Sequence, residues 1–205
     1  MVRQCAASAT VLEIGCGDGA LLGRLSEAGK TVIGVDSDET ALELAQSMFR
    51  RRGLRGEFYR ELKAVPPRRF DAVILAEVIE HLDDPESMIG ESVKRLAEGS
   101  GRLVLTTPIR LLERSLDVHH VHEFWPDELT VLLGRRFEQV RLTRMHPAWL
   151  VDLMCIAVKG VRPVAVAANL LRLTTGVELI DRLGSPLGIY WTQAVVATGP
   201  KPCAG

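Results

Sequence analysis

The amino-acid sequence predicts an α/β fold in which helices cover both faces of a mostly parallel sheet. Short apolar runs alternate with longer segments of helical periodicity between residues 10 and 107, as is typical of parallel strands joined by crossover helices. A turn with three glycines at alternate positions, VLEIGCGDG, includes the end of the first apolar run. The chain has 205 residues, of which 47% are hydrophobic, so a single domain over 1–205 can bury a core without disulfides.

Five strands are predicted before residue 108. They cover 10–14, 31–35, 56–59, 70–76 and 101–107. The helices between them cover 19–28, 38–52 and 85–98, and two of these have clear start signals. Ser37 or Asp38 can cap the second helix, and Asp84 followed by Pro85 supplies a capping oxygen and a preset φ for the third.

The pattern changes after Pro108. A histidine-rich loop leads to a helix predicted over 126–133, and two further strands are predicted over 137–145 and 189–198. These two strands complete a doubly wound seven-stranded sheet, to which they add an edge with an antiparallel final strand.

An apolar insertion at 147–187 separates the last two strands and is predicted to be helical. Charged residues interrupt it, so no run reaches the ~18–20 apolar residues that span a bilayer. It can pack over the sheet or a partner subunit, cover the acceptor site as a lid, or contact a membrane surface. Nothing in the sequence favours an oligomeric state.

Composition and charge exclude several classes of protein. The formal net charge of −1 gives no overall footprint for nucleic acid, and the arginines at 50–52 and 55 are interpreted as the solvated end of a helix. Four scattered cysteines without a CxxC pair indicate a reducing, intracellular setting and no structural zinc site. Since no leader pattern precedes residue 11, the cytoplasm is the expected location.

The glycine turn is the expected ligand site. Glycine accepts backbone angles that a Cβ forbids and lets the main chain approach a ligand closely. The turn follows a strand and precedes a helix, which is where open α/β sheets bind ligands. Asp36 ends the second strand, where a carboxylate can bind ribose hydroxyls. The spacing fits a dinucleotide as G-x-G-x-x-A, or a nucleoside sulfonium as G-x-G-x-G after Glu13.

Downstream segments favour the sulfonium. FDAVILAEVIEHLDDPESM, GRLVLTTP and HVHEFWPDEL resemble the corresponding segments of class I S-adenosylmethionine-dependent methyltransferases, in particular the branch with the ubiquinone-pathway O-methyltransferases. The resemblance runs from about residue 10 to residue 145 and includes the final strand. It implies a Rossmann-like fold and S-adenosylmethionine as the cofactor.

The resemblance also implies which residues bind that cofactor. The expected set is Glu13, Gly15, Cys16, Gly17 and Gly19 in the turn, Asp36 and Ser37 after the second strand, Glu61 and Leu62 in FYREL, and Ala76 and Glu77 after the fourth strand. In this family the glycines lie beneath the methionine and ribose, and an acid in the position of Glu61 often receives the adenine amino group.

The expected reaction is methyl transfer to a small lipid-like, phenolic or glycosyl acceptor, and the expected methylated atom is oxygen. The sulfonium methyl is already electrophilic, so the protein must desolvate it and align a nucleophile. A general base helps when the nucleophile is a hydroxyl, and histidine exchanges its proton nearest neutral pH. The candidate bases are His122, His81 and His119, with His120 beside them.

A metal site is an alternative reading of the EVIEH segment. If a helix begins at Glu77, then Glu77, Glu80 and His81 face the same way, and His122 completes a set suited to Mg²⁺ or Mn²⁺. This set resembles that of metal-dependent enzymes that 2′-O-methylate RNA 3′ ends. Metal-free methyltransferases carry similar segments, and the weak basic charge counts against RNA, so no metal is the first expectation.

Two other classes of function remain as alternatives. An NAD(P)-dependent oxidoreductase would need catalytic residues such as a Tyr-x-x-x-Lys pair, which neither Tyr59 nor Tyr190 provides. A non-catalytic module that binds the cofactor within an assembly would show binding without turnover.

Overall fold

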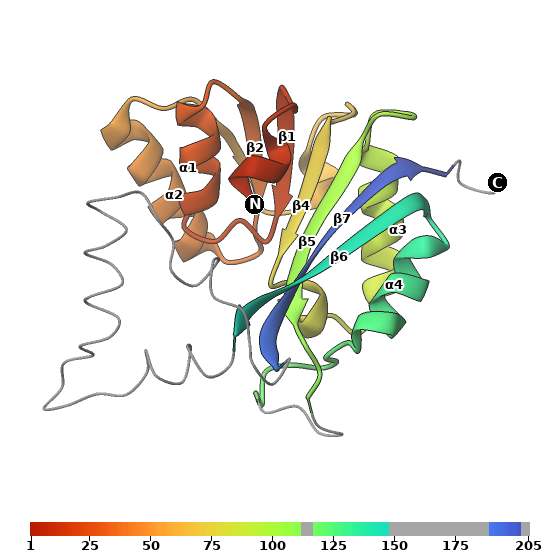
Figure 1. Cartoon of the computed structure of the whole chain (residues 1–205). Coiled ribbons are helices and arrows are strands. Elements are labelled where there is room, and N and C mark those ends of the chain that lie inside the picture. The colour runs from red at the N-terminus through yellow and green to blue at the C-terminus, as the bar shows by residue number, and fades with distance from the viewer. Residues whose placement is uncertain (112–116, 148–188, 202–205) are drawn as a thin grey trace, which may run out of the picture. The chain divides into compact units, whose positions relative to one another are not determined.

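The computed structural model describes residues 1–111, 117–147 and 189–201 (Figure 1). It contains two compact units, of which one comprises Met1–Leu142 with Val195–Gly205 and the other Thr143–Ala194. Almost all of the predicted insertion at 147–187 lies outside the described residues. Its helical character, its role as a lid and the assignment of 1–205 to one domain therefore stay predictions.

A seven-stranded sheet in the order β3-β2-β1-β4-β5-β7-β6 organises the fold. The strands are β1 (Thr10–Ile14), β2 (Thr31–Val35), β3 (Glu57–Tyr59), β4 (Ala72–Ala76), β5 (Arg102–Pro108), β6 (Phe137–Pro147) and β7 (Tyr190–Pro200). β1 to β5 pair in parallel, and β7 is the antiparallel strand. The predicted mixed sheet is confirmed. Strand order reverses between β1 and β4, where open α/β sheets form their ligand crevice.

Helices cover both faces of this sheet. Among the described residues, the α-helices are α1 (Ala20–Glu27), α2 (Glu39–Arg52), α3 (Pro85–Arg95) and α4 (Pro126–Gly134), and the short 3₁₀ helices are η1 (Val2–Cys5), η2 (Leu62–Ala64) and η3 (Ile79–His81). α1 and α2 lie on one face of the sheet, and α3 and α4 lie on the other (Figure 1). The central strands β1, β2, β4 and β5 are therefore largely buried on both sides, and their ends can present polar groups to a ligand.

The predicted capping residues are confirmed. The Asp38 carboxylate accepts hydrogen bonds from the amides of Thr40 and Ala41, and the Asp84 carboxylate accepts one from the Ser87 amide. These bonds satisfy amides that have no partner within the first helical turn.

The predicted C-terminal end of the third helix is wrong. α3 ends at Arg95 rather than at residue 98, because Leu96 adopts an extended backbone with φ −81° and ψ 147°. Leu96 forms a parallel bridge with Phe70 and is fully buried. Burial of this side chain therefore competes with, and overrides, continuation of the helix.

The second unit is described only at its two ends. Within it, the His146 ring nitrogen Nδ1 lies 3.1 Å from the Thr192 hydroxyl oxygen, which joins the described end of β6 to the start of β7. In the parts of the chain that the structure describes, no helix is long and apolar enough to cross a membrane.

Candidate active site

The glycine turn lies at the point where the strand order reverses. The amides of Gly15 and Cys16 donate to the carbonyl oxygen of Val35 over 2.7 and 3.0 Å, which ties the turn to the end of β2. Gly15 has φ 76°, and a Cβ there would lie 2.4 Å from Cγ2 of Val78. Both the backbone angle and the close packing require glycine. The turn after β1 therefore packs against the loop after β4.

Asp36 holds the middle of this turn. Its Oδ2 accepts a hydrogen bond from the Gly17 amide over 2.7 Å, and its Oδ1 accepts one from the Asp38 amide over 2.9 Å. Gly17 has φ 52°, and nothing lies within 4 Å of where its Cβ would be. The acid predicted to bind ribose thus stands beside an open stretch of backbone that a ligand can approach.

Glu13 and Cys16 are buried beneath the turn. The side chain of Glu13 is 3% exposed, and within the described ranges its Oε2 has no hydrogen-bond partner. Burial, followed by the negative charges of Asp18 and Asp36, raises the pKa of Glu13 to about 8. Burial also raises the pKa of the Cys16 thiol to about 12. Because this thiol packs 2.7 Å from where a Cβ of Gly34 would be, Cys16 can offer a ligand only its backbone.

Ala76 and Glu77 stand at the end of β4, which pairs with β1 next to the glycine turn. The Glu77 amide donates to the Thr106 carbonyl oxygen over 3.0 Å, and its side chain is exposed. Glu77 has φ 53°, in the left-handed region that residues with a Cβ rarely adopt. Such strain is found at functional positions, where the surrounding structure maintains it.

The remaining predicted cofactor residues lie at the surface beyond β2 and β3. Ser37 is exposed, and Glu61 is exposed and ion-paired with Lys63 over 2.5 Å. Leu62 packs against the core as a partly buried side chain. Their contacts with a cofactor stay predictions.

The alternative metal set required a helix that begins at Glu77, and the structure has no helix there. Glu77 is left-handed, and only the 3₁₀ turn Ile79–His81 follows it, so Glu77, Glu80 and His81 do not share a helical face. Glu80 is fully buried, and its Oε2 accepts a hydrogen bond from the Thr107 hydroxyl over 2.9 Å. Its Oε1 has no partner among the described residues. Burial is the main cause that raises the pKa of Glu80.

The loop after β5 brings His120 to His81, and their ring centroids lie 5.0 Å apart, whereas His119 contributes only its backbone carbonyl and has an exposed side chain. The Glu80 carbonyl oxygen accepts hydrogen bonds from the amides of Val121 and His122 over 2.8 and 3.1 Å, which fixes the loop beside η3. Nδ1 of His81 lies 3.0 Å from the carbonyl oxygen of His119. Because a carbonyl only accepts, this nitrogen carries the proton, and Nε2 of His81 keeps its lone pair.

His120, rather than His122, completes the cluster with Glu80 and His81. Ligand atoms of these three residues all lie within 4.8 Å of one another. The alternative metal set is thus only partly assembled, since Glu77 and His122 stand outside this group. Nδ1 of His120 lies 2.8 Å from Oε1 of Glu123. Glu123 was not predicted from the sequence, although its spacing of three residues from His120 is one that can bring two side chains together.

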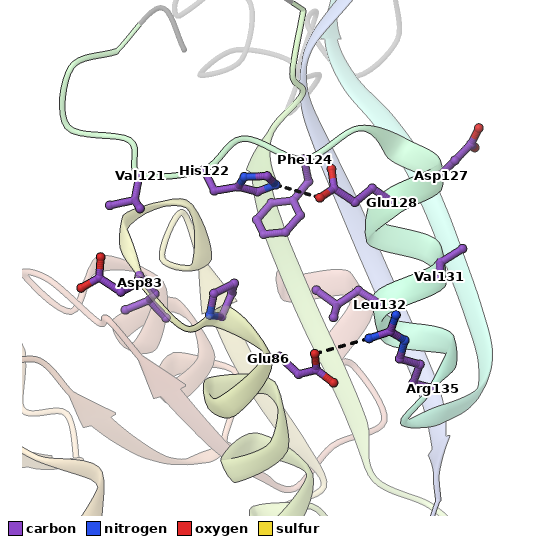
Figure 2. A pocket seen from close by; sticks show the side chains of 12 residues that line it. Asp83, Glu86, Val121, His122, Phe124, Asp127, Glu128, Val131, Leu132 and Arg135 are labelled. Atoms are coloured by element: carbon purple, nitrogen blue, oxygen red, sulfur yellow. Dashed lines mark hydrogen bonds and ion pairs between the residues drawn. The ribbon is translucent and has the colours of Figure 1, made fainter. Parts of the chain in front are cut away.

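His122 points into a groove between the start of α3 and α4, shown in Figure 2. The groove has a volume of about 730 Å³, and apolar side chains that include Leu82, Phe124 and Leu132 line it. Nε2 of His122 lies 2.8 Å from Oε1 of Glu128.

Charged groups also line this groove. Oε2 of Glu128 accepts a hydrogen bond from the Trp125 amide over 3.3 Å, and Arg135 pairs with Glu86 over 3.4 Å. Glu128 was not predicted from the sequence either, although a glutamate at the third residue of a helix indicates a cap. It also missed Arg135, for which the sequence carries no signal.

Comparisons with known proteins show which family the chain resembles and which fold it shares. A family model described as a methyltransferase domain matches residues 2–158. A probable S-adenosylmethionine-dependent methyltransferase of Mycobacterium tuberculosis is 35% identical over 128 residues, or 60% of this chain and 46% of that protein. A ubiquinone biosynthesis O-methyltransferase of Leptothrix cholodnii is 34% identical over 102 residues, or 47% and 43%. The chain spans about half the length of these relatives.

Solved structures show the same fold. A SAM-dependent methyltransferase from Archaeoglobus fulgidus has a TM-score of 0.65 at 20% identity, over 96% of this chain and 89% of that chain. Magnesium protoporphyrin IX methyltransferase from Synechocystis PCC 6803, solved with bound SAH, has a TM-score of 0.61 at 16% identity, over 96% and 79%. The predicted Rossmann-like fold is confirmed.

Proposed function

The chain belongs to the methyltransferase domain family, as its sequence predicts, and on that premise we propose that it transfers the methyl group of S-adenosylmethionine to a hydroxyl oxygen of a small acceptor. The packing of Gly15 against Val78 is the observation that supports this most. It joins the turn that would bear the cofactor to the loop that carries His81, three residues after Val78.

The cofactor residues would act mainly through backbone and carboxylate groups. Gly17 would let the main chain approach the methionine and ribose, since the space beside its Cα is open. Asp36 would accept hydrogen bonds from the ribose hydroxyls, with one lone pair of each oxygen still available beside its bonds to Gly17 and Asp38. Ala76 and Glu77 would line the methionine end.

His81 would act as the general base. Its protonated Nδ1 is held by the His119 carbonyl, so Nε2 is the nitrogen that can accept the hydroxyl proton. As the acceptor oxygen attacks the methyl carbon, the bond from carbon to sulfur breaks. The electron pair stays on sulfur as an uncharged thioether, and the proton moves to Nε2. His122 is the weaker candidate, because Glu128 engages its Nε2.

The acceptor would be a molecule with an apolar or aromatic part next to its hydroxyl. The groove beside the histidine cluster supports this class, since Leu82, Phe124 and Leu132 give it apolar walls. One relative carries the name ubiquinone biosynthesis O-methyltransferase. A lipid-like, phenolic or glycosyl acceptor fits these features.

The test uses S-adenosylmethionine labelled in its transferable methyl group, incubated with the protein and a cell extract that contains small molecules. We expect the label to enter the organic phase, in a product that NMR shows to carry the new methyl group on oxygen. Failure of the purified protein to bind S-adenosylmethionine and S-adenosylhomocysteine at high micromolar concentration would overturn the proposal. Binding of both without any turnover would favour a non-catalytic module.

A further inference from the structure

Glu80, His81 and His120 form a cluster in which nitrogen and oxygen atoms converge. One such atom of each residue lies within 4.8 Å of the corresponding atoms of the other two. The rings of His81 and His120 stand edge to face, with their centroids 5.0 Å apart. Side chains from η3 and from the loop after β5 therefore meet at one point. The Glu80 carbonyl oxygen holds the two segments together by accepting the amides of Val121 and His122.

The carboxyl group of Glu80 brings an unused oxygen atom to this point. Glu80 is fully buried. Its Oε2 accepts the Thr107 hydroxyl over 2.9 Å, whereas its Oε1 has no hydrogen-bond partner among the described residues. A buried oxygen atom without a partner is costly. Its position beside two imidazoles indicates a ligand that the described residues do not supply.

Both imidazoles are arranged as metal-binding histidines are. Nδ1 of His81 lies 3.0 Å from the carbonyl oxygen of His119, and Nδ1 of His120 lies 2.8 Å from Oε1 of Glu123. Because these oxygen atoms accept, each Nδ1 carries the proton and each Nε2 keeps a lone pair. Histidines that bind a metal usually donate their other ring nitrogen to a carbonyl or carboxylate in this way.

The three donors favour zinc over magnesium. Zinc binds imidazole and carboxylate together and often leaves its fourth position open, whereas magnesium prefers oxygen donors in an octahedron. Zinc ligands lie about 2.0–2.2 Å from the ion, so the donors would need to close in by on the order of 1 Å. His81 is exposed and the side chain of His120 is 13% exposed, which gives an ion a path from solvent. Oδ2 of Asp117, 3.9 Å from Nε2 of His120, adds negative charge at this entrance.

We propose that Glu80, His81 and His120 bind a zinc ion, and that this ion inhibits methyl transfer. Nε2 of His81 can bind zinc or accept the proton of the acceptor hydroxyl, but not both, because each use needs the same lone pair. The inhibition rests on the proposed function, in which this nitrogen is the base. Binding of the ion does not rest on it. Removal of zinc frees the lone pair and restores the base.

The test first measures metal binding to the full chain after dialysis against a chelator. Calorimetry gives the number and affinity of Zn²⁺ ions, and the visible spectrum of added Co²⁺ gives the coordination geometry. We expect one zinc ion per chain, and a four-coordinate Co²⁺ spectrum that zinc abolishes. Mg²⁺ in large excess should displace neither ion.

Variants show whether the cluster holds the ion. His120→Ala removes a donor and should weaken zinc binding by at least about 100-fold, since loss of a group that only orients a donor already costs roughly 10–100-fold. Glu123→Gln should weaken it about tenfold for the latter reason. His122→Ala is the matched control and should bind zinc normally, because His122 pairs with Glu128 outside the cluster. If His120→Ala does not fold, His81→Ala removes a donor whose side chain is exposed.

Label transfer from S-adenosylmethionine to a deproteinised cell extract, measured as zinc is added, tests the inhibition. We expect transfer to fall as the site fills and to recover when a chelator is added. Absence of zinc binding, or equal binding by the variants that lack a donor, overturns the site. Zinc binding that leaves transfer unchanged or increases it overturns the inhibition. If the chain binds zinc but neither S-adenosylmethionine nor S-adenosylhomocysteine, the proposed function fails and the zinc site stands.

Discussion

On the proposed cofactor side, the structure is built by backbone groups at strand ends, whereas on the proposed acceptor side it is built by side chains from a loop and a helix. The turn after β1 is held by two amides on the Val35 carbonyl and one on Asp36. The acceptor side relies on paired side chains, such as His120 with Glu123 and His122 with Glu128.

This difference predicts how each side responds to substitution. A backbone conformation tolerates almost no change, because an added Cβ meets both strain and a neighbouring atom. A paired side chain at the surface, such as His122 with Glu128, loses one contact on substitution and leaves its neighbours in place. Substitutions on the cofactor side should therefore have larger effects than those on the acceptor side, with the proposed base as an exception.

Gly15→Ala should have the largest effect. The new Cβ would lie 2.4 Å from Val78 and would sit at φ 76°, which together destabilise the protein by about 3 kcal/mol. Affinity for S-adenosylmethionine should fall by roughly 100-fold, since ~2.7 kcal/mol corresponds to that factor. Thermal unfolding and calorimetry measure the two quantities.

Two variants separate the causes. Gly29→Ala has the same backbone strain, with φ 78°, but meets no atom within 4 Å, so it should lose stability and keep cofactor affinity. Val78→Ala combined with Gly15→Ala removes the clashing methyl groups and should recover part of the loss. An additive double mutant would show that the packing of the turn against the loop after β4 is unimportant.

His81→Ala is the exception on the acceptor side. Loss of a general base lowers kcat by roughly 100-fold or more. Affinity for S-adenosylmethionine should stay within about twofold, which corresponds to a free-energy difference of ~0.4 kcal/mol. His122→Ala should lower kcat much less, because Glu128 already engages that ring. The reverse ranking would return the base role to His122.

Chelation adds a second test of the same cluster. Activity that survives exhaustive dialysis against a chelator is expected if the lone pair of His81 accepts the proton directly. A requirement for added Mg²⁺ or Mn²⁺ would instead indicate that Glu80, His81 and His120 hold a cation that activates the hydroxyl.

The two sides also differ in how well the sequence predicts them. The strands β1 and β2 and the caps at Asp38 and Asp84 follow from signals within a few residues of each other. The approach of Asp36 to Gly17, 19 residues away, follows instead from the parallel pairing of β1 with β2. The histidine cluster depends on the loop after β5, which is fixed by bonds from its amides to the Glu80 carbonyl. Spacing alone could not show that His120, and not His122, meets His81. Nor could it show the left-handed Glu77.

Asp36→Asn should have an intermediate effect on the cofactor side. An amide nitrogen cannot accept the Gly17 hydrogen bond, and the charge that favours the ribose hydroxyls is lost, so affinity for the cofactor should fall roughly tenfold. Asp38→Asn is the matched control, because asparagine still caps α2. An unchanged affinity in Asp36→Asn would show that the cofactor is held elsewhere.

The stability of the free protein should depend on pH through Glu13. The pKa of Glu13 is about 8 in the fold against its ordinary value of 4.5, so the native state holds the extra proton between these values and stability falls as pH rises through this range. From pH 6 to pH 8 the loss is about 2 kcal/mol, or roughly 5 °C in Tm. Glu13→Gln should lack this part of the slope. Glu80, whose pKa is also raised, contributes the same sign to both proteins.

The smallest effect is expected in the groove on the acceptor side. Arg135 and Glu86 form an ion pair over 3.4 Å, but their side chains are 60% and 47% exposed, so solvent screens their attraction. Arg135→Ala should change stability by less than about 0.5 kcal/mol, and salt should abolish the difference. Kinetics then test whether Arg135 contacts the acceptor. A raised KM for an apolar acceptor with kcat unchanged would identify Arg135 as part of the acceptor site. Unaltered KM and kcat would indicate that the apolar walls of the groove bind the acceptor without Arg135.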